Sequence, residues 1–522
     1  MLCTVFLSVA VGSIGASAAE TPVPVVYIEG SGASIYADTN DRNSERINHD
    51  DAIPDDMVQD LVSQLAKPLL DAYLKNDFTE YCDKLVEVFK PYYSRMALDE
   101  NGNPSNGAGN KCRQVFPTRD TKRNGGYGLY DYRLTYDWRL DPYETADFIN
   151  EYINRVKELT KSDKVNIICR CLGVNEFFAY VAKYGCDSIN KCIMYSAGLR
   201  GFEYCGALFS GQIVVDSDSL ERYVNSNMTA DDDTQKILKA IVQVANTTFM
   251  LKWGIKEIMD FYEKIYENVL PRLMRESHGT FPSYWSMVPP EYYDAAIELN
   301  FGAEREKYAV MIEKCDRYQR EIAGRMDDFL NDMLEQGVEL YNVTKYGYQL
   351  IPISKGSEYQ SDNTVGLVSS SDGATVSETS KKLSGSYIKA AEENGTAKYI
   401  SADRCVDAST CFMPDHTWYI KNLTHADMPA KVERELFPVI FNSTSYLTVF
   451  DDPAHPQFLL RNSDNSLSPL TVENCDTEEE KKWQSDPTGS TMYLFDKIIN
   501  AIREFVTLIK NFIESIVSAA KG

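Results

Sequence analysis

The sequence has few histidines and no concentration of positive charge. Of 522 residues only five are His, and 53 Lys and Arg stand against 77 Asp and Glu, which gives a net charge of −24. No run of Lys and Arg interrupts this excess of acidic residues. A surface that binds nucleic acid needs a basic patch, so the composition argues against nucleic acid as a main partner.

Long hydrophobic runs are missing after residue 19. The charge-free stretch Leu2–Ala19 has an apolar core that runs into the small residues Gly15–Ala19. A spanning helix needs about 20 apolar residues, and this stretch ends in Gly, Ala and Ser instead. Although a basic n-region is missing, the pattern favours a signal peptide over a short membrane anchor. We therefore expect a secreted or cell-surface protein.

Cysteine is present in an odd number once the signal is set aside. The chain has 12 Cys, and Cys3 would leave with the signal peptide. In an oxidising compartment at least one of the remaining thiols is then unpaired or pairs between chains.

Strands and helices alternate along much of the chain. Short apolar strands at Val23–Ile28, Lys164–Cys169 and Ser188–Ser196 are separated by helical patterns. Asp141 and Pro142 mark the start of one of these helices. This alternation predicts an α/β fold, with a mostly parallel sheet covered by helices.

The domain organisation follows from where these patterns change. From about residue 211 to 336 the sequence is nearly all helical, residues 354–385 are rich in Ser, Thr and Gly, and residues 443–489 permit no assignment. The expected segments are a signal peptide (1–19), a first core part (20–210), a helical cap insertion (211–337), a second core part (338–445), an acidic turn-rich tail (446–490) and a C-terminal amphipathic helix (491–522).

The sharpest chemical signal is the run Cys169–Gly173 between a strand and a helix. A strand, a tight turn and a helix form the setting of the nucleophile elbow, G-x-S-x-G, where the central residue sits above the sheet edge. Cys171 occupies the nucleophile position, and a helix N-terminus beside Arg170 favours its thiolate. Two alternatives are a metal pair with Cys169, which lacks a second pair at zinc spacing, and simple burial.

The run Tyr136–Leu140 (YDWRL), a capped helix and then a strand leading into this turn resemble the lecithin–cholesterol acyltransferase-like family of α/β-hydrolases. That family shows Y-D-W-R, a helix and then A-H-S-M-G-G. Residues Val25–Ser34 (VVYIEGSGAS) look like its oxyanion loop, P-G-x-G-G-S. Thr280–Trp285 with Pro289 is similar to its cap segment, P-S-x-x-x-L-x-P.

The resemblance spans about residues 23–442 and implies an α/β-hydrolase fold with a helical cap. It implies activity on carboxylic esters, above all lipids, as an esterase, lipase or acyltransferase without metal or organic cofactor. The sequence departs from the family at three positions, where Arg170, Cys171 and Val174 replace His, Ser and Gly. A Cys nucleophile changes leaving-group and deacylation chemistry. The rival interpretation is therefore an inactive protein of this fold that binds lipid, glycan or a protein partner.

The resemblance also implies a base and an acid. In this fold the chain order is nucleophile, acid, base, which excludes His49. His425 follows the strand-like stretch Thr417–Ile420, as the family's base does. Ala402–Val406 is similar to the family's G-D-G-T-V, which makes Asp403 the expected acid, and Asp407 competes with it. The expected oxyanion donors are the backbone N–H groups of Ser31 and Leu172.

The C-terminus forms a separate feature. Large apolar residues recur at helical spacing from Leu494 to Val517, with charged residues on the other face. Such a helix either packs on the protein's own body or lies on a lipid surface. The second possibility implies peripheral contact with lipid, in addition to a small-molecule or lipid ester substrate.

We predict that full-length protein sediments with liposomes and that a chain ending at Gly489 does not. Acidic residues on the polar face weaken attraction to anionic lipid, so apolar burial has to dominate and added salt should change binding little. Equal sedimentation of both proteins would contradict the lipid role. Reduced solubility or thermal stability of the shorter chain would indicate a docked helix instead.

Overall fold

The computed structural model describes residues 22–47, 57–227, 250–379 and 381–475. The predicted signal peptide and C-terminal helix lie outside these residues. Within them, an eight-stranded sheet has the order β14-β13-β12-β7-β6-β5-β1-β4, and all neighbours are parallel except β13 and β14. The strands are β1 (Val25–Ile28), β4 (Tyr132–Leu134), β5 (Val165–Arg170), β6 (Ile189–Tyr195), β7 (Glu339–Tyr346), β12 (Thr417–Lys421), β13 (Phe458–Arg461) and β14 (Leu467–Pro469). The predicted α/β class, a mostly parallel sheet with flanking helices, is confirmed.

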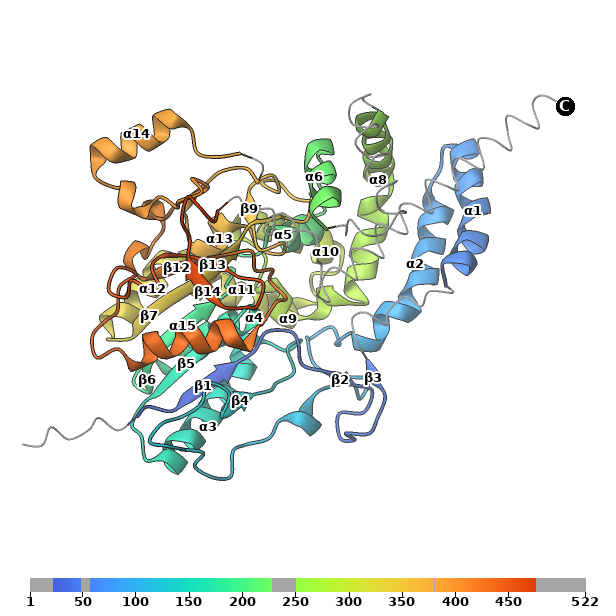
Figure 1. Cartoon of the computed structure of the whole chain (residues 1–522). Helices are drawn as coiled ribbons and strands as arrows, with labels where there is room; N and C mark the ends of the chain where they lie inside the picture. Colours follow the sequence, from blue (N-terminus) through green and yellow to red (C-terminus); the bar gives the residue numbers. More distant parts are fainter. Residues whose placement is uncertain (1–21, 48–56, 228–249, 380, 476–522) are drawn as a thin grey trace, which may run out of the picture.

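Both faces of the sheet are buried, as its β-branched strands require. In β1, Val26 and Ile28 pack into one hydrophobic core, whereas Val25 and Tyr27 pack into a second core on the opposite face. Helices α3 (Pro142–Thr160) and α4 (Leu172–Tyr184) cover the first face, and α15 (Ala430–Asn442) covers the second (Figure 1). The predicted start of α3 is confirmed, because the Asp141 side chain accepts from the Tyr143 N–H at 3.0 Å.

Helices make up the chain between β6 and β7 in the part that the structure describes. They are α5 (Glu203–Ser210), α6 (Ser217–Asn227), α8 (Met250–Arg275), α9 (Pro282–Trp285), α10 (Pro290–Phe301), α11 (Ala309–Glu321) and α12 (Met326–Glu335). Helix α8 also packs against α2 (Thr79–Tyr93), which pairs with α1 (Met57–Lys75), and the three stand together beside the sheet domain (Figure 1).

Two predicted boundaries need correction. Residues 354–385, expected as a long loop, contain β9 (Gln360–Ser361), α13 (Leu367–Ser371), β10 (Thr375–Val376) and the start of α14 (Gly385–Asn394). The expected tail supplies β13 and β14, which extend the sheet beside β12. Elements this short carry too little periodicity to be recognised in a sequence. The remaining short strands are β2 (Ile35–Tyr36), β3 (Arg46–Ile47), β8 (Tyr348–Gln349) and β11 (Val406–Asp407).

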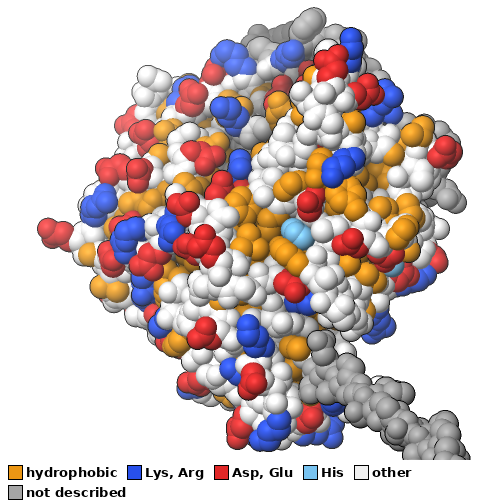
Figure 2. All heavy atoms as spheres, turned by 90° about the vertical axis from the view of Figure 1, so that its left-hand side faces the viewer, with side chains coloured by type: hydrophobic (Ala, Val, Ile, Leu, Met, Phe, Trp, Pro, Cys, Tyr) orange, Lys and Arg blue, Asp and Glu red, His pale blue; other side chains and the backbone are white. Residues whose placement is uncertain are grey.

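The charged side chains show no segregation by sign on the face drawn in Figure 2. Acidic and basic side chains are interspersed over the face shown in Figure 2. Within the described ranges, no helix combines the length and the apolar character needed to cross a bilayer.

The Y-D-W-R run builds a buried ion pair. Both oxygens of Asp137 accept from the Arg139 guanidinium, at 2.9 and 2.7 Å, and both residues are buried. Two further guanidinium N–H groups donate to the backbone carbonyls of Met96 and Ala108, each at 2.8 Å. Arg139 therefore ties the loop after β4 to two segments that precede it in the chain.

We predict that Arg139→Met lowers the free energy of unfolding by about 3–5 kcal/mol, because it leaves the Asp137 carboxylate buried without its partner. Urea denaturation measures the change. Arg155 is a matched control, since it also donates to a backbone carbonyl, that of Pro117, but is partly exposed. Arg155→Met should stay within about 0.5 kcal/mol of the wild type. Equal effects of the two substitutions would contradict this account of Arg139.

Candidate active site

Cys171 lies in the turn that joins β5 to α4. Its φ of 52° and ψ of −129° lie outside the regions that most residues with a Cβ adopt. A backbone strained in this way persists only where its surroundings hold it, and such positions cluster at functional sites. The strain makes Cys171 a stronger candidate than its sequence position alone.

Two glycines allow the backbone to approach this turn closely. A Cβ added to Gly173 would lie 2.5 Å from the carbonyl oxygen of Glu29. A Cβ added to Gly30 would lie 2.9 Å from the Cβ of Cys171. The loop after β1 and the first turn of α4 can therefore meet beside the sulfur because neither glycine carries a side chain.

The Cys171 thiol is set apart from the other thiols by its charge environment. Burial raises its pKa, but the charge of His425, the guanidinium of Arg170 and the N–H of Leu172 lower it by more, so the pKa lies below its usual value. At Cys205, in contrast, burial dominates and raises the pKa. The surroundings thus favour a thiolate at Cys171.

His425 follows β12 and is bound twice to Asp362. Its Nδ1 lies 2.7 Å from the Asp362 carboxylate, and its backbone N–H donates to the Asp362 carbonyl, also at 2.7 Å. Burial lowers the pKa of His425, but Asp362 and the Cys171 sulfur together raise it to about 9. His425 is therefore mostly protonated at neutral pH, and its charge favours the thiolate of Cys171.

The Nε2 atom of His425 is the ring nitrogen that Asp362 leaves free for Cys171. It is buried and makes no hydrogen bond of regular geometry in the described structure, although the sulfur and the ring shift each other's pKa. The contact between Cys171 and His425 is therefore looser than a full hydrogen bond. Catalytic contacts are often loose before substrate binds and tighten in the complex.

Asp362 is ionised and its loop is well supported. Burial raises its pKa, but the imidazolium of His425 and the Val365 N–H outweigh burial and lower it. Its Oδ1 accepts from the Thr364 and Val365 N–H groups, at 3.0 and 2.7 Å. Glu203, at the start of α5, accepts from the Gly366 N–H and so anchors the same loop. The carboxylate is thus held in place before it meets the imidazole.

The structure corrects the predicted acid. Asp403 pairs with Lys421 at 3.1 Å and accepts from the Tyr346 hydroxyl at 3.1 Å, so its carboxylate already has buried partners away from His425. Asp407, the predicted alternative, accepts from the Tyr387 hydroxyl at 2.9 Å. The residue that meets the imidazole is Asp362, which the sequence analysis missed.

A sequence signal for Asp362 was present. Asp362–Val365 reads D-N-T-V, which matches the D-x-T-V part of the family pattern more closely than the D-R-C-V run that begins at Asp403. It was hidden in a Ser- and Thr-rich stretch expected to be only a connecting loop. The order Cys171, Asp362, His425 keeps the expected sequence of nucleophile, acid and base.

The Y-D-W-R run holds the predicted oxyanion loop on both sides of Ser31. The Tyr136 hydroxyl donates to the Glu29 carbonyl at 2.6 Å, and the Trp138 indole N–H donates to the Ala33 carbonyl at 2.8 Å. Leu172 is the first residue of α4, where backbone N–H groups lack an intrahelical acceptor. The roles of Ser31 and Leu172 as oxyanion donors stay predictions.

Aromatic side chains surround the pair. The Phe202 ring packs edge-on against the His425 ring, with centroids 6.1 Å apart. Tyr284, from α9, stacks on Trp138. Burial raises the pKa of Tyr284, and the Cys205 and Cys171 thiols raise it further. The site is therefore bordered by residues of the loop after β6 and of the helical insertion.

The other described histidines have partners other than Cys171 and Asp362. His416 bonds with the Leu447 carbonyl at 2.8 Å, His455 with Asp452 at 2.7 Å, and His278 stacks on Tyr284. Among the residues that the structure describes, no three His, Cys, Asp or Glu side chains gather in a way that would hold a metal ion.

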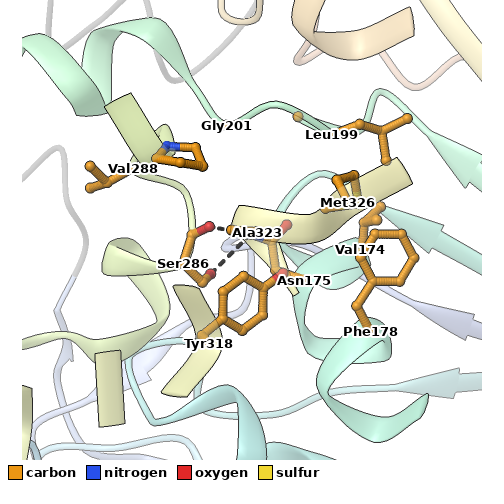
Figure 3. A pocket seen from close by; sticks show the side chains of 12 residues that line it. Val174, Asn175, Phe178, Leu199, Gly201, Ser286, Val288, Tyr318, Ala323 and Met326 are labelled. Carbon is orange, nitrogen blue, oxygen red and sulfur yellow. Dashed lines mark hydrogen bonds between the residues drawn. The ribbon is translucent and has the colours of Figure 1, made fainter. Parts of the chain in front are cut away.

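A small cavity lies beside the first turns of α4 (Figure 3). The Asn175 amide donates to the carbonyl and the hydroxyl of Ser286, each at 2.9 Å, across this cavity. Neither Cys171 nor His425 is among its lining residues. The hydrogen bonds therefore tie α4 to the helical insertion without forming part of the candidate site.

Comparisons with known proteins leave the family open. No family model and no curated protein matches the chain. Among solved structures, a chain in the crystal structure of the Tle4–Tli4 complex aligns with a TM-score of 0.26 and 9% identity, covering 62% of this chain and 74% of that chain. A likeness this weak does not assign a family.

We predict that Asp362→Asn slows alkylation of Cys171 at neutral pH by roughly tenfold or more, because loss of the carboxylate lowers the pKa of His425 and so removes the positive charge that stabilises the thiolate. Iodoacetamide labelling followed by peptide mapping measures the rate. Asp403→Asn, a buried Asp away from the ring, is the matched control and should leave the rate near that of the wild type. Slower labelling in Asp403→Asn alone would contradict the assignment.

Proposed function

We propose that this protein is a carboxylic ester hydrolase or acyltransferase of the α/β-hydrolase type, acting on lipid esters through Cys171, His425 and Asp362. The observation that carries the proposal is the buried His425–Asp362 pair beside a thiol of lowered pKa in a strained turn between strand and helix. The resemblance of the Y-D-W-R run and its neighbours to the lecithin–cholesterol acyltransferase-like family supports an ester substrate.

In the acylation step, the Cys171 thiolate attacks the ester carbonyl carbon. The carbonyl electrons move to oxygen, where the N–H groups of Ser31 and Leu172 receive the negative charge. When the carbonyl reforms, the bond to the alkoxide breaks and the alkoxide takes the proton from Nε2 of His425. The product alcohol leaves, and an acyl thioester remains on Cys171.

In the deacylation step, neutral His425 accepts a proton from water. The hydroxide formed attacks the thioester carbonyl, the carbon–sulfur bond breaks, and the carboxylic acid leaves as the thiolate returns. An alcohol in place of water yields a new ester, so the same residues support hydrolysis or transfer. Throughout both steps Asp362 stays ionised and stabilises the imidazolium.

The proposed setting is extracellular. The charge-free N-terminal stretch supports secretion, and the amphipathic pattern of residues 491–522 supports contact with a lipid surface. A secreted enzyme with such a helix would meet its substrate at a lipid–water boundary.

We predict that Cys171→Ala reduces ester turnover by roughly a thousandfold or more, because no nucleophile remains beside the base. Cys171→Ser should keep a little activity, since a hydroxyl still faces His425. Turnover is measured with chromogenic esters of short and long acyl chains and with phospholipid vesicles. Cys205→Ala is the matched control, because it removes a buried thiol of raised pKa near the site.

Full activity of Cys171→Ala would overturn the assignment of the nucleophile. A wild-type protein that turns over none of the esters and is not labelled by a thiol-directed acylating probe would favour the non-catalytic binding role. Accumulation of an acyl adduct on Cys171, identified by mass spectrometry, would support the covalent step directly.

A further inference from the structure

Two buried basic side chains hold the backbone of His425. Arg170, the last residue of β5, donates from its guanidinium to the His425 carbonyl. The Lys345 ammonium, from β7, lies 3.3 Å from the same carbonyl oxygen and 2.8 Å from that of Asp427. Both side chains are buried, Lys345 completely. One carbonyl oxygen thus receives hydrogen bonds from a guanidinium and from the Lys345 amine.

The rest of the Arg170 environment is mixed in charge. The groups that interact with its charge are Tyr27 on β1, Tyr195 on β6, Lys345 on β7, Glu433 on α15, and Cys171. Glu433 is buried and bonds to the Tyr130 hydroxyl, and the Lys345 ammonium lies 4.3 Å from the centre of the Tyr195 ring. The guanidinium Nε has no hydrogen-bond partner in the described structure.

Such an arrangement is costly. Burial and then the repulsion of Arg170 lower the pKa of Lys345 to about 7. Burying like charges and leaving a guanidinium N–H unpaired both oppose folding, and apolar residues of similar volume are often as stable or more stable. Packing alone therefore does not explain why two buried basic side chains bind one carbonyl oxygen. A role at the site of Cys171 and His425 explains it.

The contacts define that role. The His425 N–H and Nδ1 are both held by Asp362, and the His425 carbonyl is held by Arg170 and Lys345. With its backbone bound on both sides, the ring can turn little relative to Cys171. The charge of Arg170 is also near enough to Cys171 to lower the pKa of its thiol.

We propose that Arg170 is a positioning residue for the Cys171–His425 pair, which holds the His425 carbonyl in place with Lys345 and sets a permanent positive charge beside the thiolate. This inference rests on the proposed function, because it concerns the same pair. Arg170 stands where the resembling family has His, so the substitution accompanies the change of nucleophile from Ser to Cys. A thiolate gains from an adjacent fixed charge, whereas a neutral hydroxyl does not.

The test measures the alkylation rate of Cys171 against pH, together with kcat and KM for a chromogenic ester. In Arg170→Met, the pH at half-maximal alkylation should rise by about one unit, which is a tenfold loss of thiolate below that pH. The kcat should fall by roughly tenfold or more with KM nearly unchanged, because the base is misplaced while ester binding persists. Arg155→Met is the control for loss of an arginine and should match the wild type.

Arg170→Lys tests the positive charge and the hydrogen bond to the His425 carbonyl separately. It also replaces Arg170→Met as the test variant if Arg170→Met does not fold. Lysine keeps the charge, so the alkylation midpoint should stay near that of the wild type. It lacks the guanidinium that reaches the His425 carbonyl, so kcat should still fall. An unchanged midpoint in Arg170→Met, or an unchanged kcat in Arg170→Lys, would overturn the inference.

The two readouts also keep this inference apart from the proposed function. Alkylation needs no ester, so its pH profile tests Arg170 whatever the substrate is. Failure of the wild type to turn over any ester would contradict the proposed function. An unchanged alkylation profile in Arg170→Met, together with an active wild type, would contradict the positioning role of Arg170 and leave the proposed function standing.

Discussion

The double contact between His425 and Asp362 is the constraint on which the site depends. It joins the loop after β12 to the loop that follows β9, and the two partners are 63 positions apart in the chain. The carboxylate keeps a buried imidazole charged, and that charge in turn stabilises the thiolate of Cys171. Burial lowers the pKa of His425 and raises that of Cys171, and Asp362 is the largest contribution that raises the pKa of His425 against burial.

The backbone around Cys171 is held by groups that take no part in the proposed chemistry. Tyr136 and Trp138 bind the carbonyls on either side of Ser31, and Gly30 and Gly173 let two segments approach the turn. The Y-D-W-R run therefore acts indirectly, because its side chains support the loop around Ser31. This explains how the motif can persist beside a changed nucleophile.

The two buried arginines, Arg139 and Arg170, differ in how far their partners compensate the charge of the guanidinium. Arg139 has a carboxylate and two carbonyls as partners, so its charge is compensated and the pair strengthens the fold. Arg170 has a carbonyl that it shares with Lys345 and an unpaired Nε, so its charge is only partly compensated. A poorly compensated charge costs stability, but its field reaches the neighbouring thiol.

Sequence patterns were enough to predict the alternation of strands and helices, the start of α3 and the position of Cys171 between a strand and a helix. These are local properties, since periodicity, capping residues and turns act over a few residues. The sequence did not determine which carboxylate meets His425, because Asp362 and Asp403 both lie in irregular segments with plausible patterns. The three-dimensional fold was needed for this, because pairing across distant loops depends on where β7, β9 and β12 place their ends. The same holds for Arg170 and Lys345, which meet on the His425 carbonyl.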